Sequence, residues 1–338
     1  MSVRSLARDP NRRGGPPILR SVPAVLLCRD GPKTTERPPE DLSELRDKPC
    51  WLDLVAPGES DLGLVAKELS LHPLAVEDAL QRYERPKIEQ YEGHYFIVFY
   101  ALEEPEPGIV NTHQVSIFVL ANAIVTVHDK EFAARTAVEK RFREGGLASS
   151  GLLLHALLDT MVDQYFQIVD GFGDRVEQLE SMIMETRPSA HQLSLRELFA
   201  LKRDLLRIRH LIAPEREVLS ALARGEITEL REAGRRAYYQ DVYDHIVRVT
   251  DEIDTFRDLT SNVIDAHLAA ASNRLNEVMK VLTSVATILL VLSVVTSFFG
   301  MNFEILPFGS PSVFWMSMAA TGVVAVLLLV YFRRKRYL

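Results

Sequence analysis

The chain has 338 residues, of which 47% are hydrophobic and 25% charged, as is typical of a soluble domain joined to a small membrane part. The formal net charge of −7 argues against a nucleic-acid partner, because phosphate contacts need a concentrated basic face. The two cysteines, Cys28 and Cys50, are expected to form neither a disulfide framework nor a zinc site, which predicts a reducing compartment.

Residues 1–20 are basic and rich in Gly and Pro, and without the apolar stretch of a secretory signal they predict a disordered leader. Residues 21–145 alternate β-branched and aromatic runs with turn signals such as Glu92-Gly93 and Ala121-Asn122. They predict a cytoplasmic α/β domain with an antiparallel or mixed sheet. Neither GxxxxGK nor GxGxxG follows a predicted strand, so we expect no nucleotide partner.

Residues 146–234 are predicted to form a helical hairpin. Apolar residues between 158 and 183 recur alternately every four and three positions, Pro188 should end the first helix, and the second should end near Pro214. The first helix also carries an acidic stripe, made of Asp159, Asp163, Asp170, Asp174 and Glu177. This stripe either attracts divalent cations or is a solvated face, partnered by the cations of the second helix: Lys202, Arg203 and Arg207.

The third helix is predicted to run unbroken over 235–299, since no Pro or Gly occurs before Gly300. Its first part, 235–280, is expected to be a cytoplasmic stalk on the way to the membrane. Its last part, 281–299, is uncharged and long enough, at ~1.5 Å per residue, to cross a hydrocarbon core of ~30 Å.

A second uncharged run, 313–332, predicts another span, and residues 300–312 form the loop between the two. The tail, 333–338, begins with four cations, Arg333, Arg334, Lys335 and Arg336, whereas the loop contains no Lys or Arg. Positive charge favours the cytoplasmic surface, so we expect both termini inside an inner (plasma) membrane and the loop outside.

Two spans cannot enclose a water-filled path, so a pore would require several copies around an axis. The first span has a smaller and more polar stripe, made of Asn276, Met279, Thr283, Ala286, Leu290, Ser293 and Ser297. The stripe either lines a pore or lets Ser and Thr bond to their own helix and allow close helix packing.

Six segments occur in this order along the chain: HPLAVEDAL, ERPKIE, YEGHYFIV, DVYDH, RLNEVMKVLTSVATILL and TSFFGMNFE, followed by an apolar second span and a basic terminus. Together they resemble the CorA family of magnesium channels. The resemblance covers almost the whole chain from about Val22. It implies a funnel-shaped homopentamer, in which the long helix and first span of each subunit line the axis and the second span lies outside.

The family's outer selectivity filter corresponds to Gly300, Met301 and Asn302. Mg²⁺ gives up water reluctantly, so a ring of neutral carbonyl and amide oxygens suits its hydrated form. Gly300 is expected to let the backbone turn there, and Glu304 implies an outer acidic ring that concentrates cations.

The resemblance also implies a hydrophobic constriction at Met279, Leu282 and Leu290, where apolar rings close a pore by dewetting. It places polar pore positions at Asn276 and Ser293 and an acidic ring at Asp265.

Regulatory metal sites between neighbouring cytoplasmic domains correspond to Glu92, Asp163 and Asp241. Intracellular Mg²⁺ bound there would keep the gate shut. Two departures bear on these expectations: Val291 stands where the family commonly has Pro, and Gly93 stands where some relatives have a second carboxylate.

The sequence therefore predicts a gated Mg²⁺ channel that also passes Co²⁺ or Ni²⁺. The alternatives are a Zn²⁺ or Co²⁺ transporter of the same fold, and a membrane-anchored oligomeric scaffold or sensor that does not conduct. We do not expect an enzyme, because the histidines are scattered and no pairing of a nucleophile with a base is visible.

Overall fold

The computed structural model describes residues 23–31, 33–39, 42, 45, 48–81, 83–106, 108–184, 188–225, 227, 235–301, 310–335 and 337. It divides the chain into two units, Met1–Ser261 and Asn262–Leu338. Helix α6 belongs to both, and each unit is described by itself.

The first unit contains a seven-stranded sheet in the order β2-β1-β3-β7-β6-β5-β4. The strands are β1 (Ala24–Asp30), β2 (Lys33–Arg37), β3 (Cys50–Val55), β4 (Lys87–Tyr91), β5 (His94–Glu106), β6 (Ile109–Val119) and β7 (Ala123–His128). Only the β3–β7 pair is parallel. The sheet is therefore mixed, as predicted.

The predicted turns at Glu92-Gly93 and Ala121-Asn122 are present, and each joins two antiparallel strands into a hairpin, β4–β5 and β6–β7. In the first, Gly93 has a φ of 82°, a left-handed conformation that favours glycine. This turn gives a physical reason for glycine at a position where some relatives have a carboxylate.

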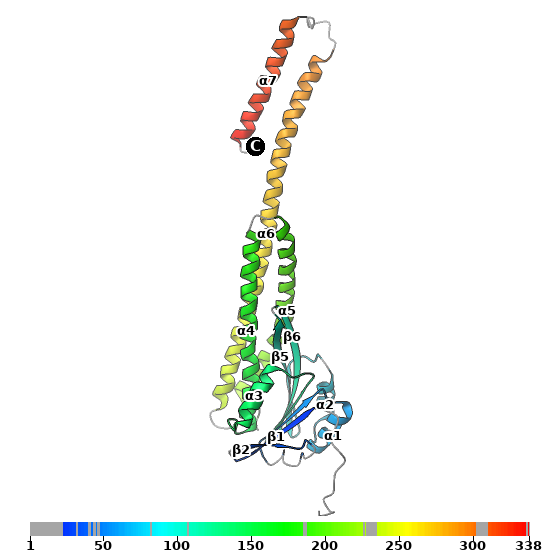
Figure 1. The fold of residues 1–338 in the computed structure, drawn as a ribbon, viewed down its shortest axis with the longest axis vertical. Coiled ribbons are helices and arrows are strands. Elements are labelled where there is room, and N and C mark those ends of the chain that lie inside the picture. The colour runs from blue at the N-terminus through cyan, green and yellow to red at the C-terminus, as the bar shows by residue number, and fades with distance from the viewer. Residues whose placement is uncertain are drawn as a thin grey trace, which may run out of the picture. The chain divides into compact units, whose positions relative to one another are not determined.

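Alternate residues of the strands form an apolar core with α1 (Glu59–Leu69) and α2 (Pro73–Leu80). Phe96, Val98 and Phe118 belong to this core together with Leu62 and Val65 of α1. Figure 1 shows these two short helices beside the sheet. Helix α3 (Ala133–Arg143) follows the last strand and contacts α4.

The sheet corrects the expectation for the cysteines. Cys28 of β1 lies directly opposite Cys50 of β3, with their Cα atoms 4.2 Å apart, and the two side chains form a disulfide. Antiparallel register brings them together, and sequence spacing alone does not reveal register.

Helices α4 (Ser150–Met184) and α5 (Pro188–Arg224) are those of the predicted hairpin. The predicted apolar seam of α4 is buried at Leu158, Val162, Tyr165, Val169, Phe172, Val176 and Leu179. The expected end of α5 near Pro214 is wrong, because the helix continues to Arg224. Val218, Leu219 and Leu222 are buried beyond the proline, and their packing offsets a cost of about 3 kcal/mol for proline inside a helix.

Helix α6 (Arg235–Phe299) is a single helix of 65 residues, as predicted. After the loop comes α7 (Pro311–Arg334), and both helices contain an 18-residue stretch apolar enough to cross a membrane. Almost none of either stretch is buried, unlike the core helix of a soluble protein. The two predicted spans therefore coincide with the C-terminal part of α6 and with α7.

Candidate functional site

Within the second unit, the predicted pore positions of α6 form an exposed face. The exposed fractions of Met279, Leu282 and Leu290 are 53%, 62% and 65%. Asn276 and Ser293 are exposed as well. The described residues of the chain thus leave the side chains of this face uncovered.

The opposite face of the span is more covered. Ile288, Leu292, Val295 and Phe299 are each half-buried. Helix α7 has its own half-buried residues at helical spacing, including Ser317, Thr321, Val324 and Leu328. Figure 1 shows α7 running beside this end of α6, so the polar stripe lies on the side away from α7.

A cation–π contact joins α6, at the start of its apolar stretch, to the residues that follow α7. The Lys280 ammonium lies 5.8 Å from the ring centroid of Tyr337, just after α7. Of the predicted membrane anchor, Arg333, Arg334 and Lys335 are exposed, and Arg336 lies outside the described residues.

The helix ends in a tight turn at the predicted filter. The Gly300 N–H is 3.0 Å from the Thr296 carbonyl oxygen, and the Met301 N–H is 3.3 Å from that of Phe298. Gly300 lies at this turn without the positive φ of a left-handed glycine, and its expected role in the filter stays a prediction. A Cβ there would lie 3.4 Å from two backbone carbonyl oxygens of the preceding turn.

Asn302 and Glu304 lie outside the described residues. Asp265 is described, and its side chain is exposed on α6. The filter and both acidic rings thus stay predictions.

A second group of candidate residues lies in the first unit, between α4 and α6. Asp159, Asp163 and His245 each offer a ligand atom, and these atoms lie within 4.8 Å of one another. The His245 Nδ1 is 3.7 Å from an Asp163 carboxylate oxygen. The Phe166 ring packs edge-on against the imidazole at 5.7 Å between centroids.

The electrostatics of this cluster favour an added cation. Burial raises the pKa of Asp159, the negative charges of Asp163 and Asp241 raise it further, and the nearby histidines lower it. Burial also lowers the pKa of His155 one turn away. A divalent ion would neutralise carboxylates that repel one another, and two carboxylates with an imidazole suit a transition metal such as Co²⁺.

Only part of the predicted regulatory set meets in one chain. Asp163 belongs to the cluster, and Asp241 lies one helical turn before His245 and acts on Asp159 through its charge. Glu92 is exposed in the β4–β5 turn. The predicted site is shared between subunits, so Glu92, Asp163 and Asp241 need not lie close together within a single subunit.

Sequence reasoning missed His245 as a partner of the acids. The signal was present, since Asp241 and His245 are spaced i, i+4 in DVYDH and so share a helix face. The rest of the acidic stripe, Asp170, Asp174 and Glu177, is exposed. Among the described residues, no ion pair joins it to Lys202, Arg203 or Arg207, so the predicted pairing with these cations is not seen and both attraction of divalent cations and a solvated face stay predictions.

A buried charge network in the sheet was also missed. Asp53 accepts hydrogen bonds from Arg135 Nε at 2.8 Å and from the Thr126 hydroxyl, and its Oδ1 lies 2.9 Å from His128 Nε2. Burial would raise the pKa of Asp53, but the bond and charge of His128, aided by Arg135 and Thr126, lower it. The network joins β3, β7 and α3 and has a structural role.

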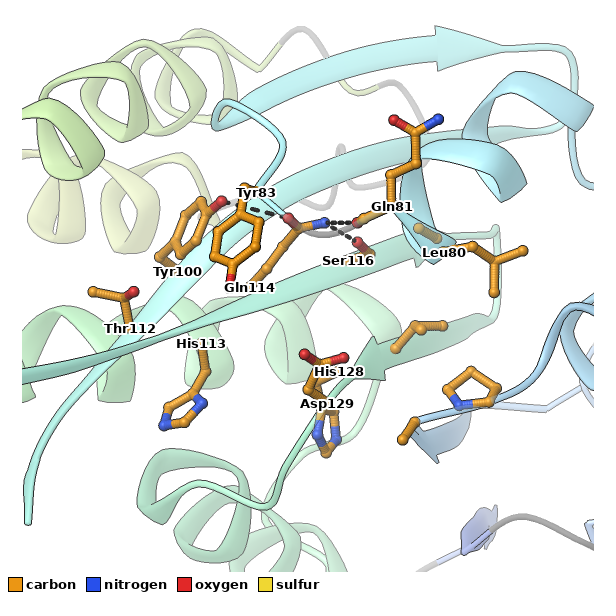
Figure 2. Close-up of a pocket in the computed structure, with 14 residues that line it drawn as sticks. Leu80, Gln81, Tyr83, Tyr100, Thr112, His113, Gln114, Ser116, His128 and Asp129 are labelled. Atoms are coloured by element: carbon orange, nitrogen blue, oxygen red, sulfur yellow. Dashed lines mark hydrogen bonds between the residues drawn. The ribbon is translucent and has the colours of Figure 1, made fainter.

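His128 also borders a cavity of about 130 Å³ on the sheet, shown in Figure 2. Gln114 spans this cavity, donating to Ser116 Oγ at 3.3 Å and to the Gln81 carbonyl at 3.1 Å, and accepting from the Tyr100 hydroxyl. The Gln114 amide is thus engaged by neighbouring groups of the lining. Among the described residues that line the cavity, no cluster of metal-ligating side chains is comparable to that between α4 and α6.

Comparison with known proteins agrees with this arrangement. The model of the CorA-like Mg²⁺ transporter protein family matches residues 46–334. The cobalt/magnesium transport protein CorA of Thermotoga maritima is 34% identical over 319 residues, covering 90% of this chain and 88% of the relative. The protein of that name from Methanocaldococcus jannaschii is 24% identical, covering 94% and 100%.

The fold agrees as well. The complete structure of the CorA magnesium transporter from Methanocaldococcus jannaschii superposes with a TM-score of 0.79 at 23% identity, covering 93% of this chain and 98% of that one. With a mixed-sheet domain, a long helix that continues into a span, and a second span, the chain belongs to the CorA family of divalent cation transporters.

Proposed function

We propose that the chain forms a gated channel through which Mg²⁺, and also Co²⁺ or Ni²⁺, enters the cell down its electrochemical gradient. The observation that carries the proposal is the exposed polar stripe of α6, which lies on the side away from α7 and leads to Gly300 and Met301. Relatives named as cobalt/magnesium transport proteins support the choice of ions.

The channel would be a homopentamer, with the stripe of each copy facing a common axis and α7 outside. Several copies are needed for a path because two helices cannot enclose water, and the resemblance to the family implies five. Asn302 would hold the hydrated ion through its amide oxygen, and Glu304 would concentrate cations at the outer mouth. The basic tail would lie on the cytoplasmic side of an inner membrane and the loop outside.

The gate would lie at the inner half of the span. Rings of Met279, Leu282 and Leu290 would exclude water when the helices are close and admit it when they tilt or rotate. Asp265 would attract the ion at the cytoplasmic end, and Asn276 and Ser293 would replace part of its water contacts.

Intracellular Mg²⁺ would regulate the gate by binding between cytoplasmic domains at Glu92, Asp163 and Asp241. The closeness of the ligand atoms of Asp159, Asp163 and His245 supports a cation bound at Asp163. Bound ions would hold the ring of subunits closed, and their loss would release α6. A divalent ion gains roughly 4.6 kcal/mol across about 100 mV, so entry needs no energy source but does need such an inhibitor.

A competition assay tests the ion assignment. The full chain is reconstituted in liposomes and uptake of Mg²⁺ is measured against Co²⁺, Ni²⁺ and Zn²⁺. We expect Mg²⁺ to enter and Co²⁺ or Ni²⁺ to compete. Entry of Zn²⁺ without Mg²⁺ would identify a zinc transporter, and absence of all uptake from an assembled protein would identify a scaffold.

A further inference from the structure

Strand β5 continues past the strand that pairs with its outer edge. The β4–β5 ladder stops at the pair Lys87–Val98, whereas β5 extends to Glu106. Tyr100 is paired with Gln114 of β6 on one side and lies beyond the last β4 pair on the other. Because buried backbone groups need partners, the outer N–H and C=O of Tyr100 must be satisfied by other elements.

Two side chains from the helical hairpin supply these partners. The Tyr100 N–H donates to Glu215 Oε1 of α5 at 2.8 Å, and the Tyr165 hydroxyl of α4 donates to the Tyr100 carbonyl oxygen. The Tyr165 oxygen also lies 3.0 Å from Glu215 Oε2. We call Glu215, Tyr165 and the Tyr100 backbone the β5 bridge.

The hydrogen-bond count assigns a proton to Glu215. A tyrosine hydroxyl has one proton, and in the β5 bridge Tyr165 gives it to the Tyr100 carbonyl, which has none to offer. The contact between Tyr165 and Glu215 Oε2 is a hydrogen bond only if the carboxyl group donates. A neutral carboxylic acid satisfies every contact in the bridge, and a carboxylate leaves two acceptors facing each other.

The surroundings agree with a neutral acid. Glu215 and Tyr165 are 0% exposed, and among the described residues no lysine, arginine or histidine forms an ion pair with Glu215. Burial raises the pKa of Glu215 well above its ordinary value, and the hydrogen bond that the Tyr100 N–H donates lowers it only in part. The ionisable groups facing Tyr100 are Glu84, Tyr83 and Glu215, and burial foremost raises the pKa of Tyr100 to about 12.

We propose that Glu215 is protonated at neutral pH and that the β5 bridge makes docking of α4 and α5 on the sheet proton-linked. When the helices leave β5, the carboxyl O–H breaks, the proton passes to water and the exposed carboxylate remains. This inference goes beyond ion transport and does not depend on it.

The sign of the pH effect follows from the raised pKa. An exposed Glu has a pKa of about 4.3, so below that value both states hold the proton and the bridge stabilises docking fully. Between that value and the raised pKa, only the undocked state is ionised. Each pH unit in this window favours undocking about tenfold.

Glu215→Gln tests the proposal, because an amide can still accept from Tyr100 and donate to Tyr165 but cannot ionise. Unfolding of the full chain in detergent is followed from pH 5 to 8, in a Trp315→Phe background so that Trp51 of β3 is the reporter. We expect the unfolding constant of the parent to rise about tenfold more per pH unit than that of Glu215→Gln. Glu217→Gln, an exposed control on the same helix, should follow the parent. Equal slopes for parent and Glu215→Gln would overturn the proposal.

Infrared spectroscopy tests whether Glu215 is protonated even if the Glu215→Gln variant does not fold. The parent should show the C=O stretch of a protonated, hydrogen-bonded carboxyl group at neutral pH. Tyr165→Phe should shift this band, because it removes the hydroxyl that accepts from the acid, and Glu217→Gln should leave it in place. Absence of the band from the parent at neutral pH would refute a protonated Glu215.

Discussion

The two ends of helix α6 differ in what covers their apolar side chains. In the first unit Val249 and Ile253 are fully buried, whereas in the second unit Leu282 and Leu290 are more than three-fifths exposed. The first unit buries these apolar side chains in its own core, because removing apolar surface from water is favourable. The second leaves its apolar surface exposed, as is typical of helices that cross a membrane. Substitutions of buried residues in the first unit should therefore act mainly on stability, and substitutions in the second unit should act mainly on transport.

The largest expected effect is on the stability of the first unit. Asp53→Ala leaves His128 and Arg135 buried without their carboxylate, so we expect a loss of about 3–5 kcal/mol in the free energy of unfolding, measured by denaturant titration. Asp30→Ala is the control, because the ion pairs of Asp30 with Lys48 and Arg37 are partly exposed and such pairs contribute little to stability. Equal losses for the two variants would show that the buried network is not special.

The same network sets a pH dependence. Because the pKa of Asp53 is lowered in the folded state, its contribution is present above the unfolded value of about 3.9 and is lost as pH falls through the folded pKa. The stability of the parent should fall in acid more steeply than that of Asp53→Asn. If the free energy of unfolding fell equally steeply with decreasing pH in the parent and in Asp53→Asn, the lowered pKa of Asp53 would be contradicted.

The next effect concerns transport alone. Asn302→Ala removes a ring of amide oxygens, and losing hydrogen bonds of about 1.5–3 kcal/mol to an ion's water shell should cut Mg²⁺ flux about tenfold to a hundredfold. The oligomer should survive, which size-exclusion chromatography checks. A scaffold would assemble and behave unchanged.

A smaller change in the opposite direction is expected at the gate. Leu290→Ser should wet the constriction and raise basal flux about fivefold to tenfold, since ~1 kcal/mol of closed-state barrier is removed. Leu292→Ser is the matched control, a leucine of the same span that lies half-buried on the face opposite the polar stripe. If both variants leak alike, Leu290 does not mark the pore face.

The smallest effect should come from the regulatory acids. Asp241→Asn should raise flux about fivefold when internal Mg²⁺ is high and change little when it is low, as for a modest coupling energy. Asp251→Asn, an exposed acid on the same helix, should leave the feedback intact. Unchanged inhibition in Asp241→Asn would place regulation elsewhere, for example at Asp159 and His245.

The sequence predicted features that depend on local pattern. The unbroken helix over Arg235–Phe299 followed from the absence of Gly and Pro, and the β4–β5 hairpin from the turn at Gly93. Features that depend on tertiary packing escaped it. Pro214 was expected to end α5, but residues buried beyond it keep the helix going.

Pairings between distant segments were equally out of reach. Cys28 meets Cys50 through strand register, His245 meets Asp163 across two helices, and Glu215 reaches Tyr100 from α5. No spacing in the chain encodes these contacts directly. The filter residue Asn302 stays a prediction from resemblance.

The most direct test of a channel is Mg²⁺ entry into liposomes against an imposed membrane potential, with Asn302→Ala as the paired control. With about 100 mV, negative inside, the parent should accumulate Mg²⁺ above the outside concentration, because a divalent ion gains roughly 4.6 kcal/mol. Accumulation should vanish when the potential is collapsed. In liposomes that contain Asn302→Ala, Mg²⁺ should enter slowly both with and without the potential. Mg²⁺ entry that ignores the potential, or equal entry in parent and Asn302→Ala, would contradict the account.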